Sequence, residues 1–325
     1  MKKILLINLA TVFILLLFLE LLSNYLKLSN LKGIERGLID TKSSIHKMIP
    51  GSSGVHFGKK IFIDEHGLRV PFQNYTYNEK NNSILVIGDS TTFGNGVSEE
   101  ETFVGKLRDN FKDLNFYNTA VPGYNIKHFK GTLNNFDKFK NVKKAYYFIT
   151  LNDLYDGRSI IKLDNKKREN SEIKKVSNLS RDLIMKVHAF LRNKSYLYMF
   201  IVGVTTDPSK RYFKDVIIYY ENNNMLEMEE YISKLNNTSS KKNIKLKIIL
   251  LPYEYQTREC TQQNLIPQKK IIKILIKLKI NYSDYTKEFC DYDKPKNLFY
   301  KYDPMHLSSK GHSFVYNLLK NEINY

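Results

Sequence analysis

Several polar residues of this chain have the types that acyl transfer by a serine nucleophile requires. Ser90 lies in the turn that follows a short apolar run, and Asp303 and His306 share one short segment near the C-terminal end. A serine hydroxyl becomes a good nucleophile when a histidine takes its proton and a carboxylate orients that histidine. We therefore expect Ser90 to be the nucleophile, His306 its base and Asp303 the partner of the base.

The same chemistry needs hydrogen-bond donors for the negative charge that develops on the substrate oxygen. Gly123 follows a second apolar run and Asn152 follows a third. Backbone N–H groups and amide side chains commonly form such an oxyanion hole, and one donor typically contributes about 3 kcal/mol. We expect Ser90, Gly123 and Asn152 to form the hole. Asp89 is expected to orient the nucleophile loop through hydrogen bonds to its backbone.

These residues can meet only if a sheet gathers them at one edge. Short apolar runs typical of buried parallel strands alternate with helical patterns along the chain. Strands are expected at 84–87, 115–118, 145–149, 246–252 and 280–283, and helices at 99–112, 125–139, 268–279 and 308–320. This alternation predicts an α/β fold, in three α/β/α layers with a parallel, flavodoxin-like sheet. Ligands of such sheets bind at the carboxyl ends of the strands, where the candidate residues fall.

Four short blocks of the sequence resemble the conserved blocks of the SGNH, or GDSL, hydrolases and occur in that family's order. They are Gly88-Asp89-Ser90, Gly123, Asn152-Asp153 and Asp303-Pro304-Met305-His306. Residues 88–97 and the upstream Gly67-Leu68-Arg69 are similar to membrane-anchored bacterial members associated with cell-envelope glycans. The resemblance implies the same triad and the same oxyanion hole.

One position departs from the family pattern. The third block usually reads Gly-x-Asn-Asp, and here Thr150 stands where the glycine would be. A side chain at this position restricts the backbone, so we expect a narrower site there. The substitution bears on the shape of the substrate more than on the mechanism.

The N-terminal segment has the length and composition of a membrane span. Residues 4–22 are almost wholly apolar, and as a helix they would extend roughly 28 Å, close to the thickness of a bilayer's hydrocarbon core. No Ala-x-Ala cleavage site follows, which favours an uncleaved anchor over a signal peptide. Lys2 and Lys3 favour a cytoplasmic N-terminus, although Lys27, Lys32 and Arg36 weaken this bias. We expect a single-pass protein whose main domain lies on the periplasmic or extracellular side.

The chain divides by composition into three parts. Residues 1–26 are the expected transmembrane anchor, residues 27–80 a linker that leads into the main domain, and residues 81–325 the hydrolase domain. The polar, lysine-rich stretch at about 154–243 exceeds what one crossover helix needs, so it is interpreted as a helical insertion. It could be a surface elaboration or a wall of the substrate site. Helical stretches are expected near 180–202 and 213–236.

The formal net charge of +18 is spread along the chain without a clustered patch or a known nucleic-acid module. We therefore expect no nucleic-acid partner, and a basic surface suited to anionic lipid or an acidic glycan.

Metal-ligand spacing is absent from the histidines at His46, His56, His66, His128 and His188, so neither a metal nor a cofactor is predicted. Cys260 and Cys290 could be separate thiols or, in an oxidising compartment, a disulfide.

Some residues near the expected site have two interpretations. Glu254 and Arg258 could line the substrate cleft or lie solvated in a loop. His312 is expected to be a packed or capping residue of the last helix. Tyr253, Tyr255, Tyr300 and Tyr302 could stack on a sugar or pack in the core or its rim.

Together these observations predict a serine esterase that removes an acyl group, most simply acetyl, from a cell-envelope glycan through an acyl-serine intermediate. One alternative is an O-acyltransferase that modifies an exported polysaccharide, with a membrane-bound acyltransferase as its candidate partner. Another is a non-catalytic glycan-binding or assembly protein on the same fold, because a fold does not fix a function.

Overall fold

The centre of the molecule is a five-stranded parallel sheet. The computed structural model describes residues 2–32, 37–40, 46–154, 183–184, 186–188 and 190–323. The sheet consists of β6 (Asn82–Ile87), β7 (Leu114–Asn118), β8 (Val142–Ile149), β9 (Lys245–Leu250) and β10 (Asn281–Asp284). Its order is β10-β9-β8-β6-β7, and every neighbouring pair is parallel. With its first strand between the second and the third, this is the predicted flavodoxin-like order.

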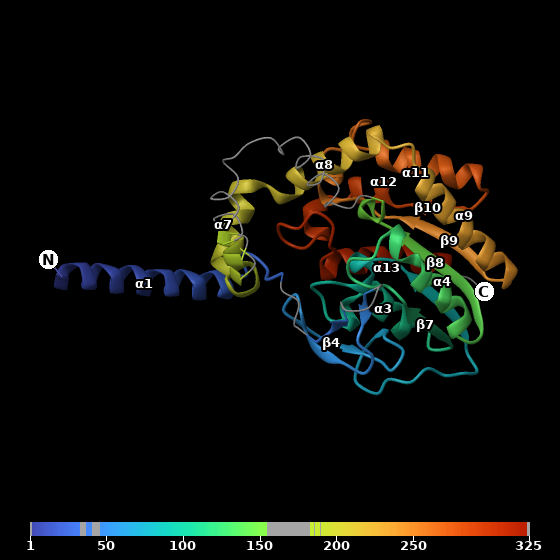
Figure 1. The fold of residues 1–325 in the computed structure, drawn as a ribbon, viewed down its shortest axis with the longest axis horizontal. Coiled ribbons are helices and arrows are strands. Elements are labelled where there is room, and N and C mark those ends of the chain that lie inside the picture. Colours follow the sequence, from blue (N-terminus) through green and yellow to red (C-terminus); the bar gives the residue numbers. More distant parts are fainter. Residues whose placement is uncertain are drawn as a thin grey trace, which may run out of the picture.

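Helices cover both faces of the sheet, which confirms the three predicted layers (Figure 1). Side chains alternate along each strand, so Leu85 and Ile87 join one buried cluster while Ile84 and Val86 join the other. The first face is covered by α4 (Phe129–Lys138), α8 (Pro208–Asn222), α9 (Leu226–Lys241) and α11 (Ile266–Lys277). The second is covered by α3 (Phe103–Asn110), α12 (Thr286–Cys290) and α13 (Ser309–Leu319).

The inserted segment is divided differently from the two helical stretches expected at 180–202 and 213–236. Part of the first stretch lies outside the described residues. The described residues of this stretch before Ser195 are helical, and after Ser195 a separate helix, α7 (Tyr196–Thr206), begins. It ends where Asp207 caps α8 and Pro208 opens it. An aspartate N-cap followed by proline is a strong start signal, so it separates two helices. A second break at residues 223–225 separates α8 from α9.

Residues before the main sheet form two small antiparallel sheets. One pairs β1 (Ile39–Asp40) with β2 (Lys47–Met48), and the other joins β3 (Ser53–His56), β4 (Lys59–Ile63) and β5 (Arg69–Val70). Short 3₁₀ helices span Glu99–Glu101, Ile126–His128, Leu151–Asp153, Pro295–Leu298 and Lys320–Glu322. The three-stranded sheet therefore lies in the segment that sequence analysis assigned to the linker.

The helix α1 (Lys2–Tyr25) projects from the rest of the molecule as an exposed apolar rod (Figure 1). It is long and apolar enough to cross a membrane. Its only acidic residue, Glu20, contacts the first turn of α7. Glu20 accepts hydrogen bonds from Tyr196 N (2.6 Å), Leu197 N (3.1 Å) and Ser195 Oγ (2.6 Å). An anionic side chain is favoured at a helix N-terminus, so this contact fixes α1 to α7.

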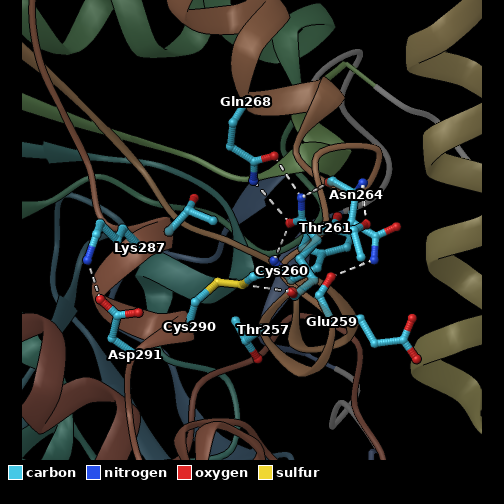
Figure 2. The surroundings of a disulfide bond; sticks show 12 residues. Thr257, Glu259, Cys260, Thr261, Asn264, Gln268, Lys287, Cys290 and Asp291 are labelled. Atoms are coloured by element: carbon cyan, nitrogen blue, oxygen red, sulfur yellow. Dashed lines mark hydrogen bonds and ion pairs between the residues drawn. A yellow bond between two sulfur atoms is a disulfide. The ribbon is translucent and has the colours of Figure 1, made fainter.

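A disulfide joins Cys260 to Cys290 (Figure 2), with their Cα atoms 6.2 Å apart. It connects the segment after the short helix α10 (Glu254–Arg258), which follows β9, to the end of α12, which follows β10. The bond thus ties together the elements that continue from two neighbouring strands.

Candidate active site

The nucleophile candidate lies at the carboxyl end of the first strand of the sheet. Ser90 is the first residue of α2 (Ser90–Phe93), and Asp89 is the N-cap of this helix. Asp89 Oδ1 accepts a hydrogen bond from Thr91 N at 2.9 Å, which is the orienting role expected for it. The Ser90 hydroxyl is buried within 2.8 Å of His306 Nε2. That distance suits the transfer of a proton from the hydroxyl to the imidazole.

The base candidate and its partner share one tight loop. His306 Nδ1 lies 3.0 Å from Asp303 Oδ2. The other carboxylate oxygen of Asp303 accepts hydrogen bonds from the backbone N–H groups of Met305 (3.0 Å) and His306 (2.9 Å). Pro304 O accepts from Glu254 N at 2.9 Å, which fastens the loop to the end of β9. Three residues predicted from the sequence therefore meet in the order that nucleophilic catalysis needs.

The Asp303 carboxylate has one more partner that sequence analysis missed. Lys32 Nζ lies 2.9 Å from Asp303 Oδ2 and donates to Tyr302 O at 2.8 Å. Burial alone would raise the pKa of Asp303, but the charges of His306 and Lys32 and the hydrogen bonds from His306 hold it well below its ordinary value. Asp303 is therefore a stable carboxylate. A lysine in a linker gives no pattern by which this contact could be found from sequence.

A second missed group approaches the imidazole from the nucleophile loop. Asn95 Nδ2 lies 3.3 Å from His306 Nε2, and Asn95 Oδ1 lies 2.5 Å from His56 Nε2. Burial is the main cause that lowers the pKa of His56 to about 4, so this ring is neutral at pH 7 and donates to the amide. The ring of Phe57 also meets His306 edge-on, with centroids 5.4 Å apart. The His306 ring is therefore restricted by Asn95 from the nucleophile loop, which His56 of β3 holds, and by Phe57, which directly follows β3.

Asn152 lies beside the nucleophile through its contact with Asp89. Asn152 Nδ2 donates to Asp89 Oδ2 at 2.8 Å, while its Oδ1 accepts from Tyr253 OH at 2.8 Å. An amide nitrogen carries two hydrogens. Within the part of the chain that the structure describes, the second hydrogen on Nδ2 has no partner, so it is available to a substrate oxygen.

Thr150 supports Asn152 and does not merely narrow the site. Its hydroxyl lies 2.6 Å from Asn152 Oδ1 and 3.0 Å from Asp89 Oδ2, and can donate to either. Its backbone is extended, with φ of −111° and ψ of 162°, so the position makes no demand for glycine. The expected restriction of the backbone is therefore not the main effect of this substitution. The hydroxyl instead links the two polar groups beside Ser90.

Gly123 lies in the loop after β7. Its φ of +81° is in the region that favours glycine, which explains the residue type. The neighbouring Pro122 O lies 2.9 Å from His46 Nε2. The contribution of the Gly123 N–H to an oxyanion hole stays a prediction.

A buried ion cluster of Arg69, Glu99 and Arg108 supports the loop that carries the nucleophile. Arg69 Nη1 donates to Phe93 O (2.8 Å) and Gly94 O (2.7 Å), at the end of α2, and its Nε lies 3.0 Å from Glu99 Oε2. Arg108 forms an ion pair with the other Glu99 oxygen and donates to Phe116 O. Arg69 belongs to the Gly67-Leu68-Arg69 segment, whose resemblance to anchored hydrolases gave it no role. Its role in the structure is to satisfy carbonyls that follow Ser90.

A cavity of about 310 Å³ opens beside the triad. Asp303 and His306 line one side, and α7 and α8 supply the other, including Met199 and Arg211. The inserted helices therefore form a wall of the cavity next to the base. Another cavity, of about 460 Å³, is also lined by Asp303, together with Glu254 and Arg258. Both residues are held in place, because Arg258 pairs with Glu254 (2.6 Å) and with Asp207 (2.7 Å).

The remaining residues with two interpretations lie mostly in the interior. His312 is fully buried in α13, where Nδ1 accepts from Phe103 N at 3.3 Å, so it is a packed residue as expected. Tyr253 is fully buried, which favours core packing over sugar stacking. Among the described residues, no group of three or more His, Cys, Asp or Glu side chains is arranged to hold a metal.

Comparison with known proteins finds likeness only among solved structures. No protein-family model matches the sequence, and no curated protein matches it. A G-D-S-L family lipolytic protein from Veillonella parvula is 11% identical, with a TM-score of 0.45 over 74% of this chain and 97% of that one. The acetyl xylan esterase AlAXEase is 15% identical, with a TM-score of 0.43 over 74% of this chain and 100% of that one. A lipase/acylhydrolase from Enterococcus faecalis is 14% identical, with a TM-score of 0.44 over 74% and 95%. Likenesses this weak assign neither a family nor an activity, so the site is judged by its own geometry.

Proposed function

We propose that this protein is a serine esterase of the SGNH type that cleaves acyl esters through an acyl-serine intermediate. One observation carries the proposal: Ser90 Oγ, the His306 ring and the Asp303 carboxylate form a continuous chain of contacts at 2.8 and 3.0 Å. The chain lies at the carboxyl edge of the sheet and borders a cavity. Burial, spacing and order of the three groups are those of an activated nucleophile.

The reaction proceeds in two halves. His306 Nε2 takes the Ser90 proton as Oγ attacks the ester carbonyl, and Asp303 stabilises the imidazolium that forms. Collapse of the tetrahedral intermediate breaks the ester bond, and His306 returns the proton to the leaving alcohol. Water then gives a proton to His306 and attacks the acyl-serine, which releases the acid and restores Ser90. A sugar hydroxyl in place of water would give the transferase reaction.

The oxyanion would be stabilised by donors around the nucleophile. The Asn152 amide has one hydrogen available, and its orientation is held by Tyr253, Thr150 and Asp89. The backbone N–H groups of Ser90 and Gly123 are the further donors that we propose. Preorganised donors of this kind need no rearrangement during the reaction, which is the basis of their large effect.

The cavity favours a small acyl group on an anionic glycan. Its volume of about 310 Å³ is at the lower end for ligand sites, which suits acetyl. Its wall carries His188, Arg192 and Arg211. Burial and the charges of the two arginines lower the pKa of His188, so the ring is neutral at pH 7 beside two permanent positive charges. A carboxylate or phosphate on the polymer would be attracted to this wall.

We further propose that α1 anchors the protein in a membrane with the catalytic domain outside the cytoplasm. The helix has the required length and hydropathy, and its apolar side chains are exposed. The Cys260–Cys290 bond supports an oxidising compartment. Protease added to intact cells should degrade the domain, and protection in cells that is lost only on lysis would contradict this topology.

The catalytic claim is tested with the full chain in detergent micelles. Wild type should hydrolyse p-nitrophenyl acetate and react covalently with a fluorophosphonate probe at Ser90. Ser90→Ala should lower kcat by at least about 10³-fold and abolish labelling. Ser313→Ala, on the last helix, is a matched control that should change neither. Equal rates in wild type and Ser90→Ala would leave the non-catalytic glycan-binding alternative.

A further inference from the structure

The linker that follows α1 supplies a charged group to the candidate triad. Lys32 Nζ and His306 Nδ1 both contact the same oxygen, Asp303 Oδ2, at 2.9 and 3.0 Å. The Lys32 side chain is only 9% exposed and that of Asp303 only 3%. Lys32 Nζ also donates to Tyr302 O, so two contacts fix its position. A buried ion pair with this geometry differs from the exposed lysine contacts elsewhere on the surface.

The position of Lys32 is set by the end of α1 and by the inserted helices. Lys32 N donates to Arg192 O at 3.3 Å, and Ser29 Oγ donates to Tyr196 O at 2.5 Å. Tyr196 N is in turn capped by Glu20 from α1. Contacts therefore run without a break from α1 through α7 and the linker to Asp303. The lysine is not a loose tail residue that reaches the site by chance.

We propose that Lys32 is a positioning residue of the triad, which couples the base pair Asp303–His306 to the membrane anchor. This inference rests on the proposed function. Lys32 would hold the carboxylate in one orientation, with Oδ2 toward His306, since Oδ1 is already bound by the loop backbone. Its positive charge would also offset part of the carboxylate's pull on a proton at His306.

The second effect gives the lysine a signature in the pH profile. Removal of a cation beside the carboxylate makes protonation of the dyad easier, so the acidic limb of kcat/KM should move to higher pH. The two contacts on Asp303 Oδ2 put Lys32 Nζ within about 6 Å of His306 Nδ1, and at the effective dielectric of protein sites a charge at this range gives a displacement of roughly two pH units. Apart from Lys32, the titratable and charged groups around the dyad or its cavity, among the residues that the structure describes, are His56, His188, Arg192, Arg211, Tyr212, Asp215, Tyr300, Tyr302 and His312. They are unchanged in the test.

The experiment uses the full chain in micelles and normalises kcat to the number of sites labelled by the fluorophosphonate. Lys32→Met keeps the length of the side chain and removes its charge, whereas Lys32→Arg keeps the charge. Lys140→Met is the matched control, because it removes an exposed lysine that pairs with Glu79 on the surface. We expect Lys32→Met to lower kcat about tenfold with KM nearly unchanged, and to move the acidic limb upward. Lys32→Arg should restore most of both.

The outcomes separate this inference from the proposed function. Wild-type kcat and pH profile in Lys32→Met would overturn the role of Lys32 while Ser90→Ala still shows catalysis. If Ser90→Ala matches wild type, the proposed function itself fails. If Lys32→Met does not fold, Lys32→Arg decides: a folded arginine variant with the kcat and pH profile of wild type supports the role of the charge. A folded arginine variant whose activity per labelled site is lost contradicts it.

Discussion

Two buried carboxylates in this molecule are each held between two basic groups, and both clusters contact the segments around the nucleophile. Glu99 is bound by Arg69 and Arg108, and Arg69 also binds carbonyls that follow Ser90. Asp303 is bound by Lys32 and by His306, which contacts the Ser90 hydroxyl. Both carboxylates are at most 3% exposed, so burial and charge do not distinguish them.

The difference lies in what the basic partners can do. Arginine keeps its proton at any relevant pH, and the guanidinium groups of Arg69 and Arg108 also donate hydrogen bonds to backbone carbonyls. Histidine can gain and lose a proton near neutral pH, and His306 turns its free nitrogen toward the Ser90 hydroxyl. The Glu99 cluster can therefore only support the fold, whereas the Asp303 cluster can also take part in proton transfer. Buried charge marks a catalytic centre only where a mobile proton and a cavity accompany it.

The largest expected effect is on activity at the Asp303 cluster. Asp303→Asn removes the charge that stabilises the imidazolium, so kcat per labelled site should fall about 10³- to 10⁴-fold. Stopped-flow or steady-state hydrolysis of p-nitrophenyl acetate measures it. Asp109→Asn, at an exposed helix position, should behave as wild type. A fall of less than tenfold in Asp303→Asn would make the two clusters alike.

A substitution in the Glu99 cluster should lower the stability of the protein rather than its activity. Glu99→Gln leaves two buried guanidinium groups without a counter-charge, which typically costs about 3–5 kcal/mol of unfolding free energy. The chain contains no tryptophan, so urea unfolding is best followed by circular dichroism. Activity per labelled site should stay within about threefold of wild type. A large loss of kcat in folded protein would show that the support of α2 is itself catalytic.

The pH dependence of stability should also differ between the Glu99 cluster and the Asp303 cluster. Burial lowers the pKa of His312 to about 3, and it lies near the Arg69 cluster. A lowered pKa means that only the unfolded chain binds the proton as pH falls below about 6.5, so stability falls with decreasing pH toward 4. His312→Asn, which cannot be protonated, should reduce the loss of unfolding free energy between pH 6.5 and 4 by roughly 3 kcal/mol. An unchanged slope would assign the acid sensitivity to other groups.

The carboxylate of Asp303 contributes to stability over a different pH range. Its pKa is held below the ordinary value, so its contribution is complete above about pH 4 and is lost only in stronger acid. Urea midpoints measured from pH 7 to pH 3 in wild type, His312→Asn and Asp303→Asn would resolve the two windows. The Asp303→Asn curve should run parallel to wild type down to about pH 4.

The smallest expected effect concerns the hydroxyl of Thr150. Thr150→Val keeps the shape and removes one neutral hydrogen bond to the pair Asp89–Asn152, worth about 1 kcal/mol, so kcat should fall about fivefold. Thr150→Ser should restore it. If Thr150→Val is as active as wild type, the Asn152 amide is held well enough by Tyr253 and Asp89.

The sheet and the triad could be predicted from the sequence because their signals are local. Each core strand is a short apolar run, and residues at its carboxyl end are brought to one edge by any parallel sheet. Ser90, Asp303 and His306 therefore met as expected, although the contact between them spans most of the chain. The five strands lie within a few residues of their predicted ranges.

The contacts that were missed depend on tertiary packing of irregular segments. Lys32 and Asn95 have no distinctive neighbours in sequence, and the path of a linker cannot be read from periodicity. Glu20 is the one acidic residue in the apolar run 4–22, and nothing in the sequence shows that it caps α7. The break between α7 and α8 was marked by Asp207 and Pro208, a signal that was present but not used. The break at residues 223–225, which divides the helix expected at 213–236, carried no such signal.

The Glu20 cap also bears on how the protein would encounter its substrate. A carboxylate bonded to α7 cannot lie in hydrocarbon, so if α1 spans a bilayer the lipid surface must pass close to residue 20. Contacts between α7, the linker and Asp303 then keep the reaction centre at a set height above the lipid headgroups. Encounters with the ester would take place in a thin layer along the surface. Turnover would follow the amount of polymer per area of membrane, and long-chain material free in the medium would be a poor substrate.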